Sequence, residues 1–373
     1  MMNVWQTLKA WPGPVVLYGT GNGADKLLDA FALYGIEAAG VFASDGFVRH
    51  RVFRGYPVLS YAEARERFPG MMIAVAFASS LLGVMAQIDA LAARHPLVMP
   101  AVPVITGDAR IGRSELFDDD YREAHREALD NVRASLADEE SRALFDDVTA
   151  FRLTGALPLL RRHTASPGAV WTLLRQGRGA FRTACDLGAY RGDTVLEMLR
   201  ELPGLTRLLA FEPDPRSFSR LAALISHPAA GETPLYKTAF SVYNMAVWDT
   251  SALLCFGGDG GRGSSLTADG RPNRNRAGTR PVRAMPLDAI LGGQPVDYIK
   301  FDVEGAEAHA LRGAAAAIRT YAPVLRVALY HRTGDLWELP LLIRSLRPDY
   351  RLYLRRTLCY PDWDLDLLCL PPL

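Results

Sequence analysis

Short apolar runs that end in glycine-rich or acidic turns and lead into helical patterns recur along this 373-residue chain. The first such run covers residues 15–18, followed by a Gly-rich turn, a helical pattern through Leu33 and another apolar run at 38–42. The same alternation resumes after Arg182. Strand–helix–strand repeats of this kind predict βαβ units, which build a parallel sheet covered by helices.

The chain is long enough for two hydrophobic cores. We expect a smaller Rossmann-like α/β domain at residues 1–112, a charged helical linker or cover at 113–180, and a larger α/β domain at 181–373. The last two apolar runs, 350–354 and 365–370, are joined by a Pro-Asp turn and predict an antiparallel hairpin. The expected fold class is therefore α/β, with a doubly wound C-terminal sheet that ends in this hairpin.

Charge gives no reason to expect nucleic acid or an anionic membrane as partner, because 42 Lys+Arg balance 41 Asp+Glu. A small or neutral substrate fits better. The four cysteines contain no C-x-x-C pair, which favours reduced thiols, a cytoplasmic location and no structural zinc. Residues 1–12 lack the pattern of a secretion signal.

One stretch, residues 69–88, carries no charged side chain. It mixes Ala, Ser and Gly, and it divides into a β-like run at 72–77 and a helix-like segment. We expect a buried strand of a parallel sheet followed by a helix, and no membrane span.

The most informative motif runs from Asp186 to Thr194, where an apolar strand turns into a helix. Its glycines let the backbone approach a ligand, and the helix N-terminus offers free N–H groups to a carboxylate. Asp186, at the strand end, would meet an ammonium group. The residues expected to form this part of the site are Asp186, Gly188, Tyr190, Gly192, Asp193 and Thr194.

A second strand ends in Phe211-Glu212-Pro213-Asp214, about twenty residues further on. A carboxylate there can accept hydrogen bonds from both hydroxyls of a ribose. Together the two strand ends suit a ligand with an amino acid and a ribose, which is S-adenosylmethionine; a dinucleotide would favour a G-x-G-x-x-G turn. The alternative is that Asp186 and Glu212 only cap helices.

A third strand carries Lys300 and ends in Asp302 and Glu304. The carboxyl ends of parallel strands meet at one edge of a sheet, so these acids should face the same crevice as Asp186. Asp302 could instead be only a helix N-cap. A divalent metal could be held by Asp302 and Glu304, but the spacing does not demand one, and no metal site is predicted.

His331 closes the next predicted strand, at the same edge of the sheet. An imidazole there is suited to taking a hydroxyl proton near neutral pH, with Asp302 as the alternative base and Lys300 or Glu304 holding the acceptor. A loop histidine bonded to the backbone is the other interpretation.

Several motifs in one order resemble the FkbM family of methyltransferases. They include 186–193, the Glu212 strand end, Asn244-Met245-Ala246-Val247, Gly263-Ser264-Ser265, 299–307 and Tyr330-His331. The resemblance runs from about residue 180 to the C-terminus. It implies a class I methyltransferase fold, S-adenosylmethionine as donor, and O-methylation of a hydroxyl on a sugar, glycolipid or macrolide-type natural product.

Carried onto this chain, the resemblance assigns cofactor binding to Asp186, Gly188, Glu212 and the segment that contains Asn244 and Ala246. It places Asp302, Glu304 and His331 on the acceptor side. The family often has Asn at the position of Tyr190 and Ile or Leu at that of Phe301; neither change removes a charged contact. The Gly-rich segment 257–278, with Arg262, Ser264 and Ser265, is expected to be a long mobile loop that closes over the acceptor.

The N-terminal turn Gly19 to Ala24 also follows a strand and opens a helix, but alone it is weak evidence for a nucleotide. Asp45 comes later than a ribose-binding acid should, and no Tyr-x-x-x-Lys pair is present. A vestigial pocket or a docking domain is expected. The alternatives are a nucleotide-sugar oxidoreductase or dinucleotide-binding protein that uses this turn, and a non-catalytic scaffold. The helical stretch 118–151 could serve a homo-oligomer interface.

Overall fold

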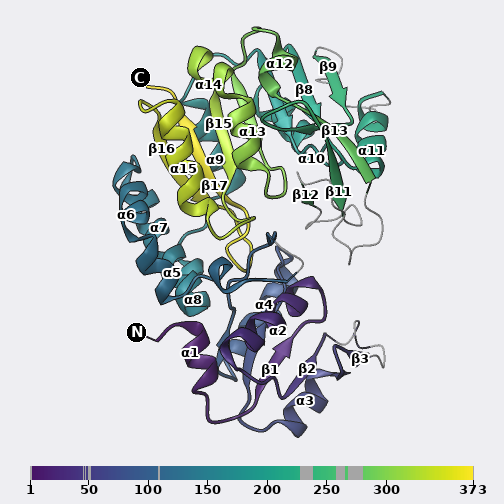
Figure 1. The fold of residues 1–373 in the computed structure, drawn as a ribbon, viewed down its shortest axis with the longest axis vertical. Helices are drawn as coiled ribbons and strands as arrows, with labels where there is room; N and C mark the ends of the chain where they lie inside the picture. Colours follow the sequence, from purple (N-terminus) through teal and green to yellow (C-terminus); the bar gives the residue numbers. More distant parts are fainter. Residues whose placement is uncertain are drawn as a thin grey trace. The chain divides into compact units, whose positions relative to one another are not determined.

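The computed structural model describes residues 2–44, 46, 48, 52–107, 110–226, 238–257, 265–267 and 280–372 (Figure 1). The chain forms two compact units, and each unit draws on several segments of the sequence. Unit 1 comprises Met1–Ala134, Glu139–Ala165 and Arg355–Leu365; unit 2 comprises Ser135–Asp138, Ser166–Leu354 and Asp366–Leu373. The division into 1–112, 113–180 and 181–373 stays a prediction.

Unit 1 is built on a sheet whose described strands follow the order β3-β4-β2-β1-β5-β6. Every neighbouring pair is parallel except β3 and β4. The predicted βαβ arrangement of the first stretch is confirmed. The strands are β1 (Val15–Tyr18), β2 (Gly40–Phe42), β3 (Val52–Phe53), β4 (Tyr56–Leu59), β5 (Met72–Val75) and β6 (Leu97–Val98), and the intervening helices are α2 (Asn22–Tyr34), α3 (Tyr61–Arg67) and α4 (Leu82–Ala92).

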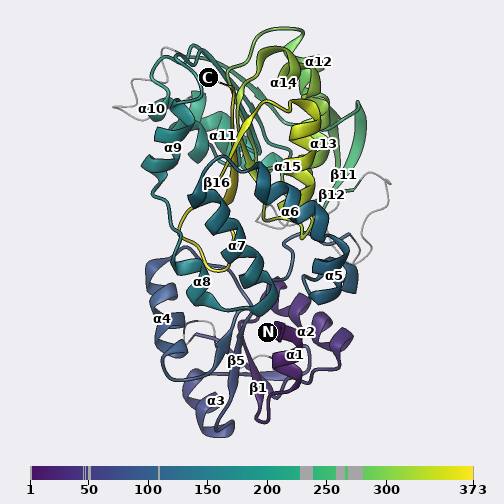
Figure 2. The same ribbon diagram turned by 90° about the vertical axis from the view of Figure 1, so that its left-hand side faces the viewer.

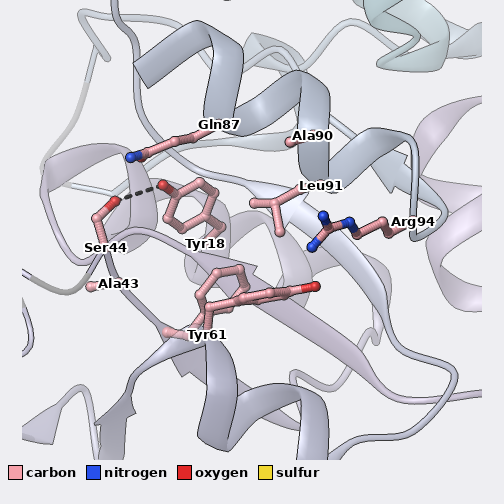
Figure 3. Close-up of a pocket in the computed structure, with 9 residues that line it drawn as sticks. Tyr18, Ala43, Ser44, Tyr61, Gln87, Ala90, Leu91 and Arg94 are labelled. Carbon is pink, nitrogen blue, oxygen red and sulfur yellow. Dashed lines mark hydrogen bonds between the residues drawn. The ribbon is translucent and has the colours of Figure 1, made fainter. Parts of the chain in front are cut away.

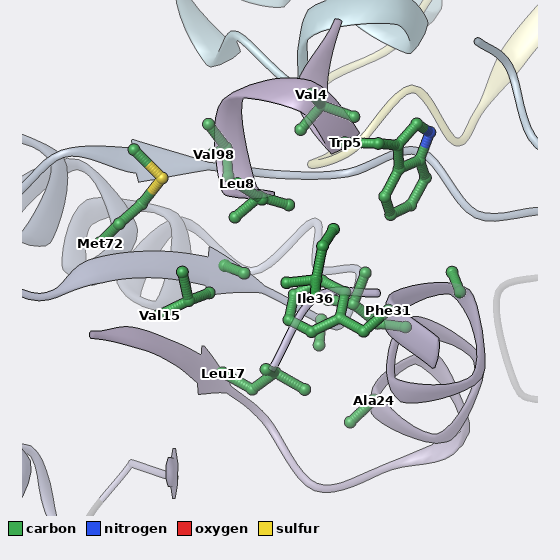
Figure 4. Close-up of a cluster of buried hydrophobic side chains, with 14 of the residues drawn as sticks. Val4, Trp5, Leu8, Val15, Leu17, Ala24, Phe31, Ile36, Met72 and Val98 are labelled. Carbon is green, nitrogen blue, oxygen red and sulfur yellow. The ribbon is translucent and has the colours of Figure 1, made fainter. Parts of the chain in front are cut away.

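The core of this sheet is closed by α2 and by the first helix, α1 (Val4–Lys9). Figure 4 shows Trp5 and Leu8 of α1 facing Leu17 of β1 and Phe31 of α2; each of these side chains is at most 2% exposed. Burial of such apolar surface is the main favourable term in folding.

The uncharged stretch 69–88 forms the buried strand β5 and then α4, as predicted. Among the described residues, no helix is both long and apolar enough to span a membrane.

Unit 1 also contains helices that come after its sheet in the sequence, and it includes part of the C-terminal hairpin, Arg355–Leu365. The helices are α5 (Asp119–Ala124), α6 (Arg126–Ser135), α7 (Glu139–Thr154) and α8 (Leu157–Arg161). Arg356, from the hairpin segment, is 1% exposed and donates to the carbonyl oxygens of Leu160 and His163. Arg152 of α7 forms a buried ion pair with Asp362 at 2.6 Å.

Unit 2 contains a larger sheet with strand order β16-β17-β15-β14-β7-β8-β9. Helices α9 and α10 lie on one side of it, and α13 and α15 lie on the other (Figure 2). The strands from β15 to β9 run parallel, whereas β17 pairs antiparallel with β15. The predicted doubly wound sheet with an antiparallel terminal hairpin is confirmed.

The bounds of its strands are β7 (Thr183–Leu187), β8 (Arg207–Phe211), β9 (Ala239–Tyr243), β14 (Tyr298–Phe301), β15 (Val324–Ala328), β16 (Arg351–Arg356) and β17 (Leu365–Leu370). The helices are α9 (Pro167–Arg175), α10 (Asp193–Glu201), α11 (Pro215–Ser226), α12 (Leu287–Leu291), α13 (Glu307–Gly313), α14 (Ala315–Tyr321) and α15 (Asp335–Leu346).

A small sheet in unit 2 corrects one expectation. It joins β10 (Ala246–Val247), β13 (Arg280–Met285), β11 (Ala252–Gly257) and β12 (Ser265–Thr267). We expected a loop throughout 257–278, yet Ser265–Thr267 pairs antiparallel with β11. A strand edge such as that of β11 offers unpaired N–H and C=O groups that a passing segment can satisfy. The rest of the predicted lid, including Arg262 and Ser264, lies outside the described residues, as does Asp45.

Candidate active site

Asp186 lies near the carboxyl end of β7 and has no exposed surface. Its Oδ2 accepts a hydrogen bond from the Thr194 hydroxyl, and its Oδ1 lies 3.5 Å from Lys300 Nζ. Burial raises the pKa of this carboxyl, while Lys300 and Thr194 act in the opposite direction. Because the Asp186 side chain has no exposed surface, a direct contact with a ligand's ammonium requires neighbouring groups to move.

The turn from β7 to α10 depends on glycine at two positions. Gly188 has φ +86°, and a Cβ there would lie 1.8 Å from the carbonyl oxygen of Asp302. Gly192 has φ +96°, and its Cβ would meet Leu224 of α11 at 2.5 Å. Only glycine fits both the backbone conformation and the space. The turn is therefore packed against the end of β14 and against α11, while Asp193 starts α10 with its side chain exposed.

Glu212 follows β8 and reaches back to this turn. Its Oε2 accepts a hydrogen bond from the Tyr190 backbone N–H at 2.8 Å, and its Oε1 accepts one from the Asp214 N–H at 2.7 Å. The residue is 6% exposed, and burial raises its pKa to about 7. Each oxygen keeps a further lone pair, so the carboxylate can still accept hydrogen bonds from ligand hydroxyls.

Three other predicted cofactor residues have structural partners. Asn244 Nδ2 donates to the carbonyl oxygens of Glu212 and Pro213, at 2.8 and 3.1 Å, and so fixes the loop that carries Glu212. Asp214 caps α11 by accepting from the Ser217 N–H at 2.9 Å. Ala246 packs in the core of the small sheet. Direct contact of their side chains with the cofactor stays a prediction.

Lys300 bridges the two acidic strand ends. Its Nζ lies 3.2 Å from Asp302 Oδ2 as well as 3.5 Å from Asp186 Oδ1, and the residue is 5% exposed. Burial alone would lower the pKa of Lys300, but Asp302 and Asp186 raise it above its usual value. Burial alone would raise the pKa of Asp302, but Lys300 and His331 bring it to about 2. Lys300 and Asp302 are therefore both charged near neutral pH.

His331 is 1% exposed and sits among three carboxylates. Its Nδ1 lies 2.9 Å from Glu307 Oε1, and its Nε2 lies 3.6 Å from Asp302 Oδ1 and 3.5 Å from Glu304 Oε2. Burial alone would lower the imidazole pKa, but Glu307 and the other two acids raise it to about 10. An imidazolium at neutral pH has no lone pair with which to take a proton, which argues against the expected role of His331 as the base.

Glu307 also belongs to this cluster, although no role was predicted for it. It is 1% exposed at the start of α13, and its Oε1 accepts from the Val303 N–H at 2.8 Å. A second acid shortly after a strand-end acid is a weak signal, since carboxylates are common in the first turn of a helix. Glu304 has φ +53°, a conformation that non-glycine residues adopt rarely and often at functional sites.

Unit 1 has a small cavity at the carboxyl ends of β1 and β2 (Figure 3). Its volume is about 230 Å³, below the range of about 300–1,000 Å³ that is usual for ligand pockets. Tyr18 stacks on Phe42 at 4.6 Å, and its hydroxyl lies 2.6 Å from Ser44 Oγ. Ala43, Tyr61, Gln87, Ala90, Leu91 and Arg94 complete the lining, which does not include the Gly19–Ala24 turn. The cavity therefore gives no support to a dinucleotide on that turn.

Comparisons with known proteins agree with the geometry of unit 2. Residues 186–355 match the family model described as the methyltransferase FkbM domain. No protein of curated function matches the sequence. The methyltransferase FkbM from Methylobacillus flagellatus KT is 19% identical, with a TM-score of 0.68 over 98% of this chain and 92% of that one.

Two further solved structures resemble a smaller part of the chain. An rRNA methylase from Streptococcus thermophilus is 12% identical, with a TM-score of 0.35 over 56% of this chain and 98% of its own. The O-methyltransferase from Bacillus cereus in complex with SAH is 15% identical, with a TM-score of 0.34 over 67% and 99%. The FkbM domain match and the full-length fold similarity are the informative findings, and the protein is a methyltransferase that carries an FkbM domain.

Proposed function

We propose that the protein transfers a methyl group from S-adenosylmethionine to a hydroxyl of a sugar, glycan or glycosylated natural product. The observation that carries the proposal is the position of Glu212, whose carboxylate is held against the β7–α10 turn by the Tyr190 N–H. A carboxylate at this strand end can accept hydrogen bonds from the two ribose hydroxyls of the cofactor. When bound, the cofactor supplies an electrophilic methyl group.

The residues around this turn fit such a ligand. Gly188 lets the turn pack against the Asp302 carbonyl group, and α10 begins directly after Gly192 with free N–H groups for a carboxylate. Asp186 and Lys300 lie behind the turn and hold it in place. We therefore assign Asp186 a positioning role, and Glu212 the direct contact.

The acceptor side is formed by Asp302 and Glu304, whose side chains are each 31% exposed. Asp302 stays ionised near neutral pH, so it can accept the hydrogen bond of an acceptor hydroxyl, orient its oxygen lone pair for in-line attack and take its proton as the methyl group is transferred. His331 and Lys300 are too buried to reach an acceptor themselves. We propose that they hold the carboxylates in place, in contrast to the expected roles of His331 as base and Lys300 as a contact to sugar hydroxyls.

The nature of the acceptor rests on the resemblance to FkbM methyltransferases. A small-molecule or glycan acceptor also agrees with the balanced charge of the chain, which offers no global attraction for nucleic acid. A cytoplasmic location is part of the same proposal, since no disulfide links Cys185, Cys255, Cys359 or Cys369. A homo-oligomer stays a prediction.

Calorimetric titration of the full chain with S-adenosylmethionine tests the cofactor assignment. We expect binding by the wild type, and at least tenfold weaker binding by Glu212→Ala. Glu201→Ala is the control, because Glu201 forms only a partly exposed ion pair with Arg175. NAD is titrated in parallel. Heat from NAD with none from S-adenosylmethionine would overturn the proposal in favour of the dinucleotide alternative.

A further inference from the structure

A group of potential metal ligands lies beside the proposed acceptor site. Asp302, Glu307 and His331 each present one ligand atom, and these atoms all lie within 4.8 Å of one another. We propose that this cluster binds a divalent cation of the Mg²⁺ or Mn²⁺ type. From the sequence, Asp302 and Glu304 could hold a divalent metal but their spacing did not demand one, so no metal site was predicted; the fold adds Glu307 and His331 to this group.

Two atoms of the cluster lack hydrogen-bond partners. Among the described residues, Glu307 Oε2 and His331 Nδ1 are buried side-chain atoms without one. Nδ1 lies 2.9 Å from Glu307 Oε1, but the ring N–H is not aligned for a hydrogen bond. A buried polar atom left unsatisfied destabilises a fold. Such atoms in a native fold call for an explanation, and a bound cation supplies one.

The balance of charge points the same way. Glu304 Oε2 adds a third carboxylate 3.5 Å from His331 Nε2. Lys300 lies between Asp186 and Asp302, so its charge is shared by these two carboxylates. Asp302, Glu304 and Glu307 thus surround one imidazole, and a divalent cation bound in place of the imidazole proton would offset part of their charge. Buried charges in proteins are either paired or bound to metal.

The ligand set indicates which cations fit. The carboxylate oxygens suit Mg²⁺ and Mn²⁺, and the imidazole favours Mn²⁺ over Mg²⁺ because nitrogen ligands are more typical of transition metals. Metal–ligand bonds of about 2.0–2.2 Å require neighbouring ligand atoms about 3 Å apart. In this structure the ligand atoms of Asp302, Glu307 and His331 lie within 4.8 Å of one another, so the side-chain ends would have to move closer together around a cation. Whichever ring nitrogen of His331 binds the cation, a carboxylate remains to hold the other.

The position of the site indicates its role, and this step rests on the proposed function. Asp302 and Glu304 are the partly exposed members of the cluster, so open coordination positions would face the acceptor. A cation there would bind the acceptor hydroxyl and lower its pKa, which makes the hydroxyl a better nucleophile without a strong base.

Mn²⁺ binding by the full chain tests the site without any assay of activity. The protein is treated with EDTA, dialysed and titrated with MnCl₂, with free Mn²⁺ followed by electron paramagnetic resonance. We expect one Mn²⁺ per chain in the wild type and at least tenfold weaker binding in Glu307→Gln and His331→Asn. Glu201→Gln is the matched control and should bind as the wild type does.

Wild-type protein that binds no Mn²⁺, or variants that bind it as tightly as the wild type, would overturn the site and leave a metal-free ion-pair cluster. The wild-type result decides even where a variant fails to fold. S-adenosylmethionine binding without Mn²⁺ binding would defeat only the cation site. Mn²⁺ binding without S-adenosylmethionine binding would defeat only the proposed cofactor.

Discussion

Lys300 and Asp186 are register partners on the adjacent parallel strands β14 and β7, and Lys300 Nζ lies 3.5 Å from Asp186 Oδ1. The same ammonium group lies 3.2 Å from Asp302 Oδ2. One buried cation therefore joins the strand end proposed for the cofactor to the strand end proposed for the acceptor. The two halves of the site should fail together when this cation is removed.

Lys300→Met tests this link. The change leaves Asp186 fully buried without its counter-charge, and breaking a buried ion pair costs about 3–5 kcal/mol. We expect the free energy of unfolding, measured by urea denaturation, to fall by about 3 kcal/mol or more. Arg175→Met is the control, since its partly exposed pair with Glu201 should be worth at most about 1 kcal/mol. Equal losses in the two variants would contradict the bridging role.

Gly188→Ala tests the packing of the turn against β14. A Cβ at this position would lie 1.8 Å from the Asp302 carbonyl oxygen, and φ is +86°. Backbone would have to move, and strain of this kind costs about 1–3 kcal/mol before any clash is counted. We expect urea denaturation to show a loss of about 3 kcal/mol or more. Gly179→Ala, which meets nothing within 4 Å, should change stability by less than about 1 kcal/mol.

Much of unit 2 could be predicted because its strands are buried on both faces. The apolar runs 183–187 and 207–211 coincide with β7 and β8. Parallel strands place their carboxyl ends at one edge, so the proximity of Asp186 and Glu212 follows once the strands are known. The Tyr190 N–H that joins the turn to Glu212 is a consequence of that geometry.

Other features depend on contacts that no local pattern reports. Glu307 meets His331 because the segment after Asp302 turns through positive φ at Glu304 and Gly305. The segment 355–365 belongs to unit 1 because Arg356 donates to carbonyl groups of Leu160 and His163. Ser265–Thr267 became a strand because β11 offered an edge. Each depends on tertiary partners distant in sequence, which override local propensity.

His331→Ala separates acceptor chemistry from cofactor binding. His331 lies against Asp302 and Glu304, so the change should disturb the acceptor side. Once an acceptor is found, we expect turnover to fall about 100-fold, the loss that misplacing the reacting groups by about 1 Å can cause, while the Kd for S-adenosylmethionine stays within threefold. Unchanged turnover would show that His331 has no role in the acceptor chemistry. A cofactor Kd that rises by more than threefold would show that the effect of His331 is not confined to the acceptor side.

The pKa of Glu212 predicts how cofactor affinity depends on pH. Burial raises this pKa from 4.5 to about 7, with Asp214 and Asp186 acting in the same direction and the N–H groups of Asp214 and Tyr190 opposing. Ribose hydroxyls donate to the ionised carboxylate, so binding requires its proton to leave. We expect the Kd for S-adenosylmethionine to be about tenfold higher at pH 6 than at pH 8, and Glu212→Gln to show no such change.

The stability of the fold should respond to the same group with the opposite sign. Because the folded pKa lies above the unfolded value of 4.5, the contribution of Glu212 to stability is full below pH 4.5 and is lost as pH rises through 7. Urea denaturation of the wild type should therefore show stability falling relative to Glu212→Gln between pH 5 and pH 8. Rising pH would thus weaken the fold while it strengthens cofactor binding. The contrary outcome is a difference between wild type and Glu212→Gln that does not change with pH, both in the Kd for S-adenosylmethionine and in the free energy of unfolding. Glu212 would then not titrate in this range, and burial against the turn would not set its pKa.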